Sequence, residues 1–129
     1  MSQVKVYGIR GQLDRVQTDL SEVIHDCVVE ALKYPRDKRA HRFFHMAPED
    51  MLYPEGRTDA YTIVEIGMIE GRSVAARKQL IRLLFERVPA RTGISTTDLE
   101  ICIQQSPAHN WGFRGQLGDE VQLNYRVDV

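Results

Sequence analysis

"YTIVEIGMIEGRS", residues 61–73, is the stretch that decides the fold. Its first nine residues are apolar on both faces apart from Glu65 and Gly67, a pattern typical of a strand in the interior of a sheet. Gly71 then favours a turn, and apolar residues recur every three or four positions over Val74–Arg91, which predicts an amphipathic helix. We therefore expect a strand, a turn and a helix in direct succession.

A second strand is expected to follow this helix. Gly93 is placed to cap the end of the helix, and Leu99–Gln104 alternates between apolar and polar residues as a half-buried strand does. Residues 61–105 thus predict one β-α-β unit. Its two parallel strands would be joined by a crossover connection, which is almost always right-handed.

The same unit occurs 60 residues earlier in the chain. At this offset Val4–Gly11 lies over Val64–Gly71, and the apolar positions of the two helices coincide. The elements expected in this half, about residues 3–46, are a strand at Gln3–Tyr7, a helix from Leu13 that stops at Tyr34-Pro35, and a strand at Arg39–Met46. The sequence therefore predicts an α/β (α+β) fold of two fused β-α-β halves within one domain, residues 1–129.

Three segments lie outside the repeated units. Ala47–Ala60 is polar, contains two prolines and a glycine, and is predicted to be a loop. The connection "SPAHNWGFRGQLGDE", residues 106–120, holds the only tryptophan of the chain and three of its nine glycines. In the rest of the tail, Val121–Val129 alternates strictly, which predicts a C-terminal strand whose apolar face and free edge need a partner.

Composition limits the classes of function. The formal net charge is -1, so no global basic field recruits nucleic acid. No apolar run approaches the roughly 18 residues of a membrane span, and the start "MSQVKVYG" has no signal-peptide pattern. Cys27 and Cys102 do not form a CxxC motif, which favours reduced thiols and a cytoplasmic location. We expect no nucleic-acid partner and no membrane partner.

Motifs for metals and cofactors are missing. His41 and His45 have helical metal-ligand spacing, but in the predicted strand they would lie roughly 13 Å apart, too far to bind one ion. No glycine loop that could hold a phosphate occurs, and no Ser-His-Asp or Cys-His order with suitable surroundings. We expect neither a metal nor a cofactor.

Two fused β-α-β halves, together with "YTIVEIGMIEGRS", "GISTTDLEICIQ" and "PAHNWGFRG", resemble the tautomerase superfamily over nearly the whole chain. Residues 61–113 are most similar to its malonate semialdehyde decarboxylase branch. The resemblance implies a mixed four-stranded sheet with two helices on one face. It also implies a homotrimer in which the tail strand pairs with a neighbouring subunit.

The resemblance also implies a reaction. In this superfamily an N-terminal proline, whose amine has a lowered pKa, moves protons at a carbon next to a carbonyl group. The printed sequence begins Met1-Ser2-Gln3, and its first proline is Pro35. Removal of Met1 would leave the primary amine of Ser2, whose pKa is ordinarily about 7.7–8.0. That amine is the candidate base if the chain places it in the pocket.

Arg72 corresponds to a family arginine that binds the substrate carboxylate. A guanidinium beside a helix N-terminus suits this role, since its fork binds carboxylates with two hydrogen bonds and the helix dipole adds to the attraction. The alternative is a solvated arginine at a helix start. A second family arginine is replaced by Glu70. Asp37 lies within about one residue of a family aspartate that orients water or substrate, although an aspartate after Pro35 is more often a turn residue.

The connection after the last core strand supplies further candidates. Trp111 and Phe113 match aromatic residues that wall the family pocket, where they would exclude water from a carboxylate–arginine pair. His109 could donate to a substrate oxygen or carry a proton near neutral pH. Arg114 could supply the positive charge that Glu70 does not. The alternative is that these residues form a subunit contact.

Two hypotheses of different classes follow. The first is a keto–enol tautomerase or related proton-transfer enzyme, acting on a small carboxylate without the usual proline base. The second is a non-catalytic ligand-binding or structural trimer on the same fold. A partner-binding module that uses the loop at residues 47–60 is a third possibility, supported only by the length and polarity of that loop.

Overall fold

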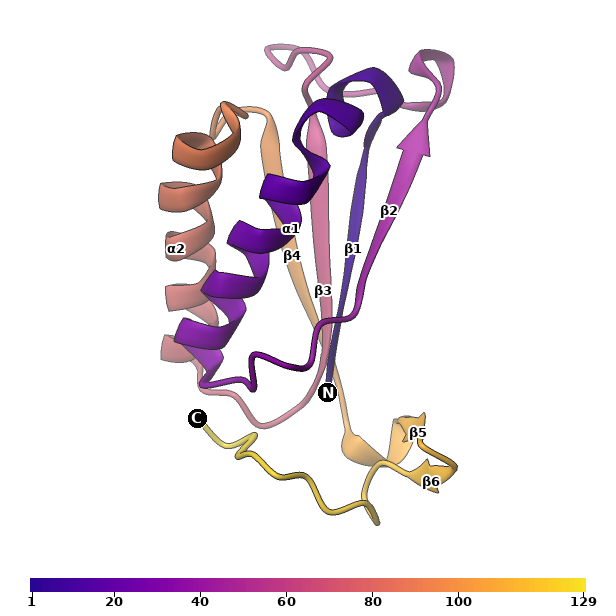
Figure 1. Cartoon of the computed structure of the whole chain (residues 1–129), viewed down its shortest axis with the longest axis vertical. Coiled ribbons are helices and arrows are strands. Elements are labelled where there is room, and N and C mark those ends of the chain that lie inside the picture. Colours follow the sequence, from indigo (N-terminus) through magenta and orange to yellow (C-terminus); the bar gives the residue numbers. More distant parts are fainter.

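The computed structural model describes all 129 residues, Met1–Val129. Its helices and long strands are β1 (Ser2–Ile9), α1 (Arg10–Leu32), β2 (His41–Met46), β3 (Thr62–Ile69), α2 (Val74–Thr92) and β4 (Leu99–Ser106). A short hairpin follows, formed by β5 (Gly112–Phe113) and β6 (Gln116–Leu117). The two helices lie over the sheet, and the hairpin and tail lie beyond one end of it (Figure 1).

The four long strands form one mixed sheet in the order β2-β1-β3-β4. β1 pairs in parallel with β2, and β3 pairs in parallel with β4, so each half is a β-α-β unit. The halves meet where β1 and β3 pair antiparallel, with Val4 opposite Ile66. This topology confirms the predicted fold class.

The 60-residue repeat extends to the ends of the elements. β1 and β3 begin and end 60 residues apart, and their buried and half-buried positions alternate in the same order. The helices also end in register, at Lys33 and Gly93, which both have the left-handed backbone conformation of a C-terminal cap, with φ 51° and 81°. Single-turn 3-10 helices at Pro48–Asp50 and Ala108–Asn110 repeat at the same distance.

Several predicted boundaries differ from the structure: the first strand is longer than Gln3–Tyr7, the second begins at His41 instead of Arg39, and two further differences have a clear cause. α1 begins at Arg10, directly after β1, although its apolar stripe begins only at Leu13. β4 continues to Ser106, because its last residues pair with the end of β3 as far as Ile69. In both cases backbone hydrogen bonding extends the element past the apolar pattern that reveals it.

The core lies between the helices and one face of the sheet. Nineteen buried residues form one cluster, among them Val6 and Ile66 from the sheet and Leu20, Ile24 and Leu84 from the helices. Each side chain of this size stabilises the fold by about 1.5–3 kcal/mol when it is fully buried. Neither helix is both long enough and apolar enough to cross a membrane.

The opposite face of the sheet, here called the open face, has no helix over it. Tyr7 and Phe44 stack on it with ring centroids 4.8 Å apart, and Lys5 lies directly opposite Glu65. Phe44 remains 38% exposed and Cys102 is exposed. Aromatic rings on an uncovered sheet face are typical of a surface that another chain covers.

The expected strand at Val121–Val129 is wrong for the single chain, because this segment forms no strand. Instead the tail folds back over the end of its own sheet. Tyr125 packs against the core cluster, Val127 lies against Gly71, and the Ser73 hydroxyl donates to the backbone oxygen of Val129 at 2.9 Å. The alternating apolar residues thus find an apolar partner within the chain. Pairing of the tail with a neighbouring subunit stays a prediction.

Candidate active site

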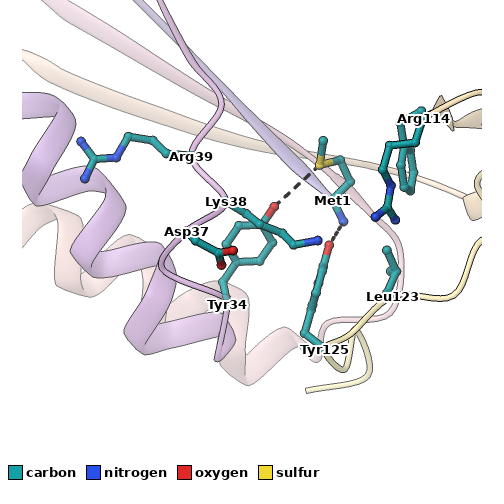
Figure 2. Close-up of a pocket in the computed structure, with 9 residues that line it drawn as sticks. Met1, Tyr34, Asp37, Lys38, Arg39, Arg114, Leu123 and Tyr125 are labelled. Atoms are coloured by element: carbon teal, nitrogen blue, oxygen red, sulfur yellow. Dashed lines mark hydrogen bonds between the residues drawn. The ribbon is translucent and has the colours of Figure 1, made fainter.

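A cavity of about 250 Å³ opens where the start of β1, the end of α1, the β5–β6 hairpin and the tail meet. It is lined by Met1, Tyr34, Asp37, Lys38, Arg39, Phe113, Arg114, Leu123 and Tyr125 (Figure 2). The lining combines apolar side chains, two phenols, an amine and several charges. Residues from the first and the last parts of the sequence therefore share one site.

The amine of Met1 is the central polar group of this cavity. It is hydrogen-bonded to the hydroxyl of Tyr125, while the Met1 sulfur accepts from the hydroxyl of Tyr34 at 3.7 Å (Figure 2). Burial, followed by the positive charges of Arg72 and Lys38, lowers the pKa of the amine from 8.0 to about 5. At neutral pH the amine is uncharged, so its lone pair is available to accept a proton.

The two phenols pack against each other beside the amine. The rings of Tyr34 and Tyr125 meet edge to face, with centroids 5.1 Å apart. Tyr34 also accepts a hydrogen bond from the backbone N–H of Ser2 at 3.3 Å. The pKa of Tyr125 is raised, mainly by burial and then by the neighbouring Tyr34. The Tyr125 hydroxyl therefore keeps its proton and can act as a donor in the cavity.

Two cations point toward the amine. The side-chain ends of Lys38 and Arg114 are directed at it in Figure 2, and the Lys38 ammonium lies 5.3 Å from the centre of the Tyr125 ring. Arg39 points its guanidinium away from Met1 (Figure 2). The end of the cavity near the amine is therefore positively charged.

The hairpin turn fixes the position of Arg114. Arg114 and Gly115 both have positive φ, 54° and 72°, and they form the two-residue connection between Phe113 and Gln116. Such turns favour glycine, asparagine and aspartate, so an arginine at the first position is uncommon. The turn places the positive charge of Arg114 in the cavity, although a residue other than glycine destabilises the fold when it adopts positive φ.

Arg72 is placed differently from both of its sequence-based interpretations. It is buried, with 3% of its surface exposed, and it is not among the residues that line the cavity. One of its terminal nitrogens, Nη1, donates to the backbone oxygen of Ile69 at 3.0 Å, whereas Nε and Nη2 have no partner. Burial lowers the pKa of Arg72 itself. Its position beside the Met1 amine makes it a source of positive potential behind the site.

The other predicted site residues divide into two groups. Asp37, Phe113 and Arg114 line the cavity. His109 is exposed on its 3-10 turn, and Trp111 is half-buried with its indole nitrogen unpartnered; neither lines the cavity. Ser2 is buried at the start of β1, directly behind Met1.

Several lining residues escaped the sequence analysis. Tyr34 and Lys38 lie on either side of Asp37 in "YPRDK", after the helix. The proline in this stretch predicts the end of a helix and a turn, and it carries no signal for a site. Leu123 and Tyr125 alternate along the tail, a pattern that predicts a strand equally well. Their spacing did show that both side chains share one face.

None of the four histidines lines this cavity. His41 Nδ1 is 2.8 Å from the Ser21 hydroxyl, and His45 Nδ1 is 3.0 Å from an Asp14 carboxylate oxygen. No three His, Cys, Asp or Glu side chains gather closely enough to hold a metal ion. The cavity beside Met1 is thus the best-equipped place for chemistry.

Comparison with known sequences gives a family. A family model described as "Tautomerase enzyme" matches residues 38–114. The probable tautomerase YrdN of Bacillus subtilis (strain 168) is 30% identical over 99 residues, which cover 73% of this chain and 76% of that protein. Both matches include the end of the first half and most of the second.

Comparison with solved structures gives the same fold. Crystal structures of malonate semialdehyde decarboxylase superpose with a TM-score of 0.79 at 22% identity, over 88% of this chain and 92% of that one. A fused 4-OT described as a wild-type symmetric trimer superposes with a TM-score of 0.76 at 22% identity, over 90% and 94% of the two chains. Structures that are only 22% identical in sequence establish the fold alone. Membership of the family is established by the family model and by the similarity to YrdN. On these grounds the chain belongs to the tautomerase superfamily.

Proposed function

We propose that this chain is a proton-transfer enzyme, a keto–enol tautomerase or a close relative, that acts on a small oxo or enol carboxylate. The observation that carries the proposal is an amine with a pKa of about 5, placed in a cavity between a phenol and two cations. Strongly perturbed groups in a cavity are concentrated at functional sites. The resemblance implies a base of the same type, an N-terminal amine with a lowered pKa, although in the family that amine belongs to a proline.

In this proposal the terminal amine is the base. It is uncharged at neutral pH and takes a proton from the carbon next to the substrate carbonyl, or from the hydroxyl of an enol. Removal of Met1 would pass this role to the Ser2 nitrogen, which already lies 3.3 Å from the Tyr34 hydroxyl. The Tyr125 hydroxyl donates to the substrate oxygen on which charge develops.

The cations and the apolar wall position the substrate. Lys38 and Arg114 bind its carboxylate, and Phe113 and Leu123 exclude water from that ion pair, which strengthens it. Burial does most to keep the amine uncharged, and Arg72 adds to this effect from behind the wall. His109 and Trp111 have no direct role in this arrangement. Asp37 lies on the lining.

The test is ketonisation of phenylenolpyruvate by tag-free protein. We expect saturable turnover whose kcat/KM rises from pH 4 to 6 and then levels off, since the amine must lose its proton near pH 5. In Arg72→Met this rise moves to higher pH, because one nearby positive charge is gone. A short Gly-Ser extension before Met1 removes the free amine and abolishes turnover.

The outcomes separate the two hypotheses. A rate equal to that of buffer, together with saturable binding of a small carboxylate, would support the non-catalytic ligand-binding trimer. Turnover that survives the N-terminal extension with an unchanged pH profile would show that the amine is not the base.

We also propose that the chain forms a homotrimer through its open face. Two observations support this: the uncovered Tyr7–Phe44 stack, and the description of a structure of the same fold as a symmetric trimer. Light scattering should give three times the chain mass of 14.8 kDa. Phe44→Glu should lower that mass, whereas Val74→Glu, a 57% exposed position on α2, should not. Equal masses for all three proteins would place the contact elsewhere.

A further inference from the structure

The amine in the cavity is a primary amine, and primary amines condense with carbonyl groups as well as accepting protons. We propose that the terminal amine forms an imine with small 2-oxo acids such as pyruvate, and that it thereby exchanges the hydrogens next to the carbonyl through an enamine. This second activity is covalent. The inference rests on the cavity of the proposed function but not on its proton-transfer mechanism.

The surroundings of the amine suit a nucleophile. An amine attacks a carbonyl carbon only when it is uncharged, and burial next to cations is a recognised way to keep it so. Met1 meets both conditions, since its nitrogen is desolvated and lies near Arg72 and Lys38. The cavity of about 250 Å³ leaves room for an acid of three or four carbons in front of it.

Tyr125 is positioned for the proton transfers of the condensation. Its hydroxyl is hydrogen-bonded to the amine, and its raised pKa keeps it protonated. As the nitrogen attacks, a C–N bond forms and the carbonyl oxygen takes the Tyr125 proton. Tyr125 then recovers a proton from the nitrogen and gives it to the departing hydroxyl, so that water leaves and a protonated imine remains.

The remaining steps need no co-reactant. A hydrogen on the neighbouring carbon leaves as a proton to the Tyr125 oxygen, which the condensation left deprotonated, and its electron pair forms the enamine, with the nitrogen as the electron sink. A solvent proton returns to that carbon, and water hydrolyses the imine to the 2-oxo acid and the free amine. The net change is exchange of carbon-bound hydrogen with solvent.

The cations select the class of carbonyl compound. Lys38 and Arg114 point toward the amine, so a carboxylate held between them places the adjacent carbonyl carbon next to the nitrogen (Figure 2). A ketone without a carboxylate lacks this anchor. We therefore expect pyruvate to react faster than acetone at equal concentration.

The test traps the imine by reduction. Folded protein and protein unfolded in urea are treated with pyruvate and cyanoborohydride at pH 6, and the adducts are mapped by mass spectrometry of peptides. About 90% of an amine with pKa near 5 is uncharged at this pH, against about 1% of one with pKa near 8. We expect one adduct on the N-terminal peptide, formed at least tenfold faster in the folded protein, and deuterium in the methyl group of pyruvate in D₂O.

Two variants sharpen the result. Lys38→Arg keeps the charge but removes the other amine of the cavity, so every adduct that still forms there must lie on the N-terminal amine. Arg114→Asn removes the charge while keeping a residue that tolerates positive φ, so adduct formation should slow several-fold. Label on Lys38 in place of the N-terminal peptide, or equal rates in folded and unfolded chains, would overturn the proposal. Ketonisation of phenylenolpyruvate without any adduct would overturn it and leave the proposed function intact.

Discussion

A second, smaller hollow lies at the opposite end of the sheet, where the start of α1 meets the start of β3 and the end of α2. This second hollow measures about 150 Å³ and is lined by residues that include Gln12, Thr62 and Ile94. At the 60-residue offset these correspond to Arg72, Ser2 and Tyr34, of which Tyr34 lines the cavity beside Met1 and the other two lie behind it. The same backbone arrangement therefore occurs twice in the molecule, with different side chains.

The chemistry of the two ends differs in three ways. β1 begins with a free amine, whereas β3 continues from Tyr61, whose hydroxyl donates to Glu100 at 2.6 Å. Lys38 is replaced by Asp98, a buried carboxylate that accepts from the Thr58 N–H and hydroxyl at 2.7 and 2.6 Å. The second end also lacks a tail to close it. The two ends thus share an arrangement of elements, and only the first end holds the amine and the cations on which the proposed chemistry depends.

The largest effect is expected when Lys38 is replaced by aspartate, the residue at the corresponding position 98 of the second half. Lys38→Asp should lower kcat/KM for phenylenolpyruvate roughly a hundredfold, or about 2.7 kcal/mol, because a substrate-binding cation becomes an anion that also raises the pKa of the amine. Lys33→Asp makes the same charge change at an exposed position five residues earlier and should keep most of the activity. Equal losses in both variants would show that only net charge matters.

The paired glycines Gly11 and Gly71 test the role of the tail. A Cβ at Gly71, where φ is 140°, would lie 2.8 Å from the Val127 side chain, whereas a Cβ at Gly11 in α1 meets nothing within 4 Å. Gly71→Ala should therefore lower the free energy of unfolding by about 2 kcal/mol and loosen the tail. Gly11→Ala should raise it by about 0.5–1 kcal/mol. Urea unfolding measures both, and a stable Gly71→Ala would argue against the tail contact.

Tyrosines at the two ends should respond differently to removal of their hydroxyls. Tyr125→Phe should lower kcat about tenfold with little change in KM, since the lost proton donor acts on the transition state. Tyr61→Phe should leave turnover unchanged and reduce stability by about 1 kcal/mol, because the Glu100 contact is structural. Steady-state kinetics with urea titrations separates the two, and a kinetic effect at Tyr61 would contradict the assignment.

The smallest expected effect concerns pH. Burial, followed by the nearby charges of His25 and Arg39, lowers the pKa of His41 from 6.5 to about 4. As the pH falls, His41 takes up a proton in the unfolded chain near pH 6.5 but in the folded chain only near pH 4. Protonation between these values therefore favours the unfolded chain, so the contribution of His41 to stability is present above pH 6.5 and is lost as the pH falls toward 4. Ile101 occupies the corresponding position in the second half. His41→Ile should therefore reduce the fall in the free energy of unfolding between pH 6.5 and 4, measured by urea titration at several pH values. If the variant loses as much stability over this range as the wild type, other groups cause the pH dependence.

The sequence predicted the regular parts of the molecule well. The turn at Gly71, the helix stripe of Leu80 and Leu84 and the repeat follow from periodicity, because each residue of a regular element faces a direction set by its position. The site was only partly predictable. Arg114 and Phe113 were expected near it, but the burial of Arg72 depends on the path of the tail.

The paths of the irregular segments could not be predicted from periodicity. Alternation along Val121–Val129 shows that Leu123 and Tyr125 share a face, but a strand on a neighbour and an irregular tail on the same chain both satisfy it. Lys38 lies in a short connection whose direction is set by contacts with distant parts of the chain. Such contacts leave no period in the sequence.

The tail that closes the cavity has a consequence for the timing of synthesis. Tyr125 and Leu123 leave the ribosome long after β1, α1 and Lys38, which are made in the first third of the chain. The nascent protein can therefore assemble its sheet and helices before the cavity has its last wall. In the proposed mechanism, reactivity toward metabolites therefore begins only after the tail has been made and has packed against the rest of the fold.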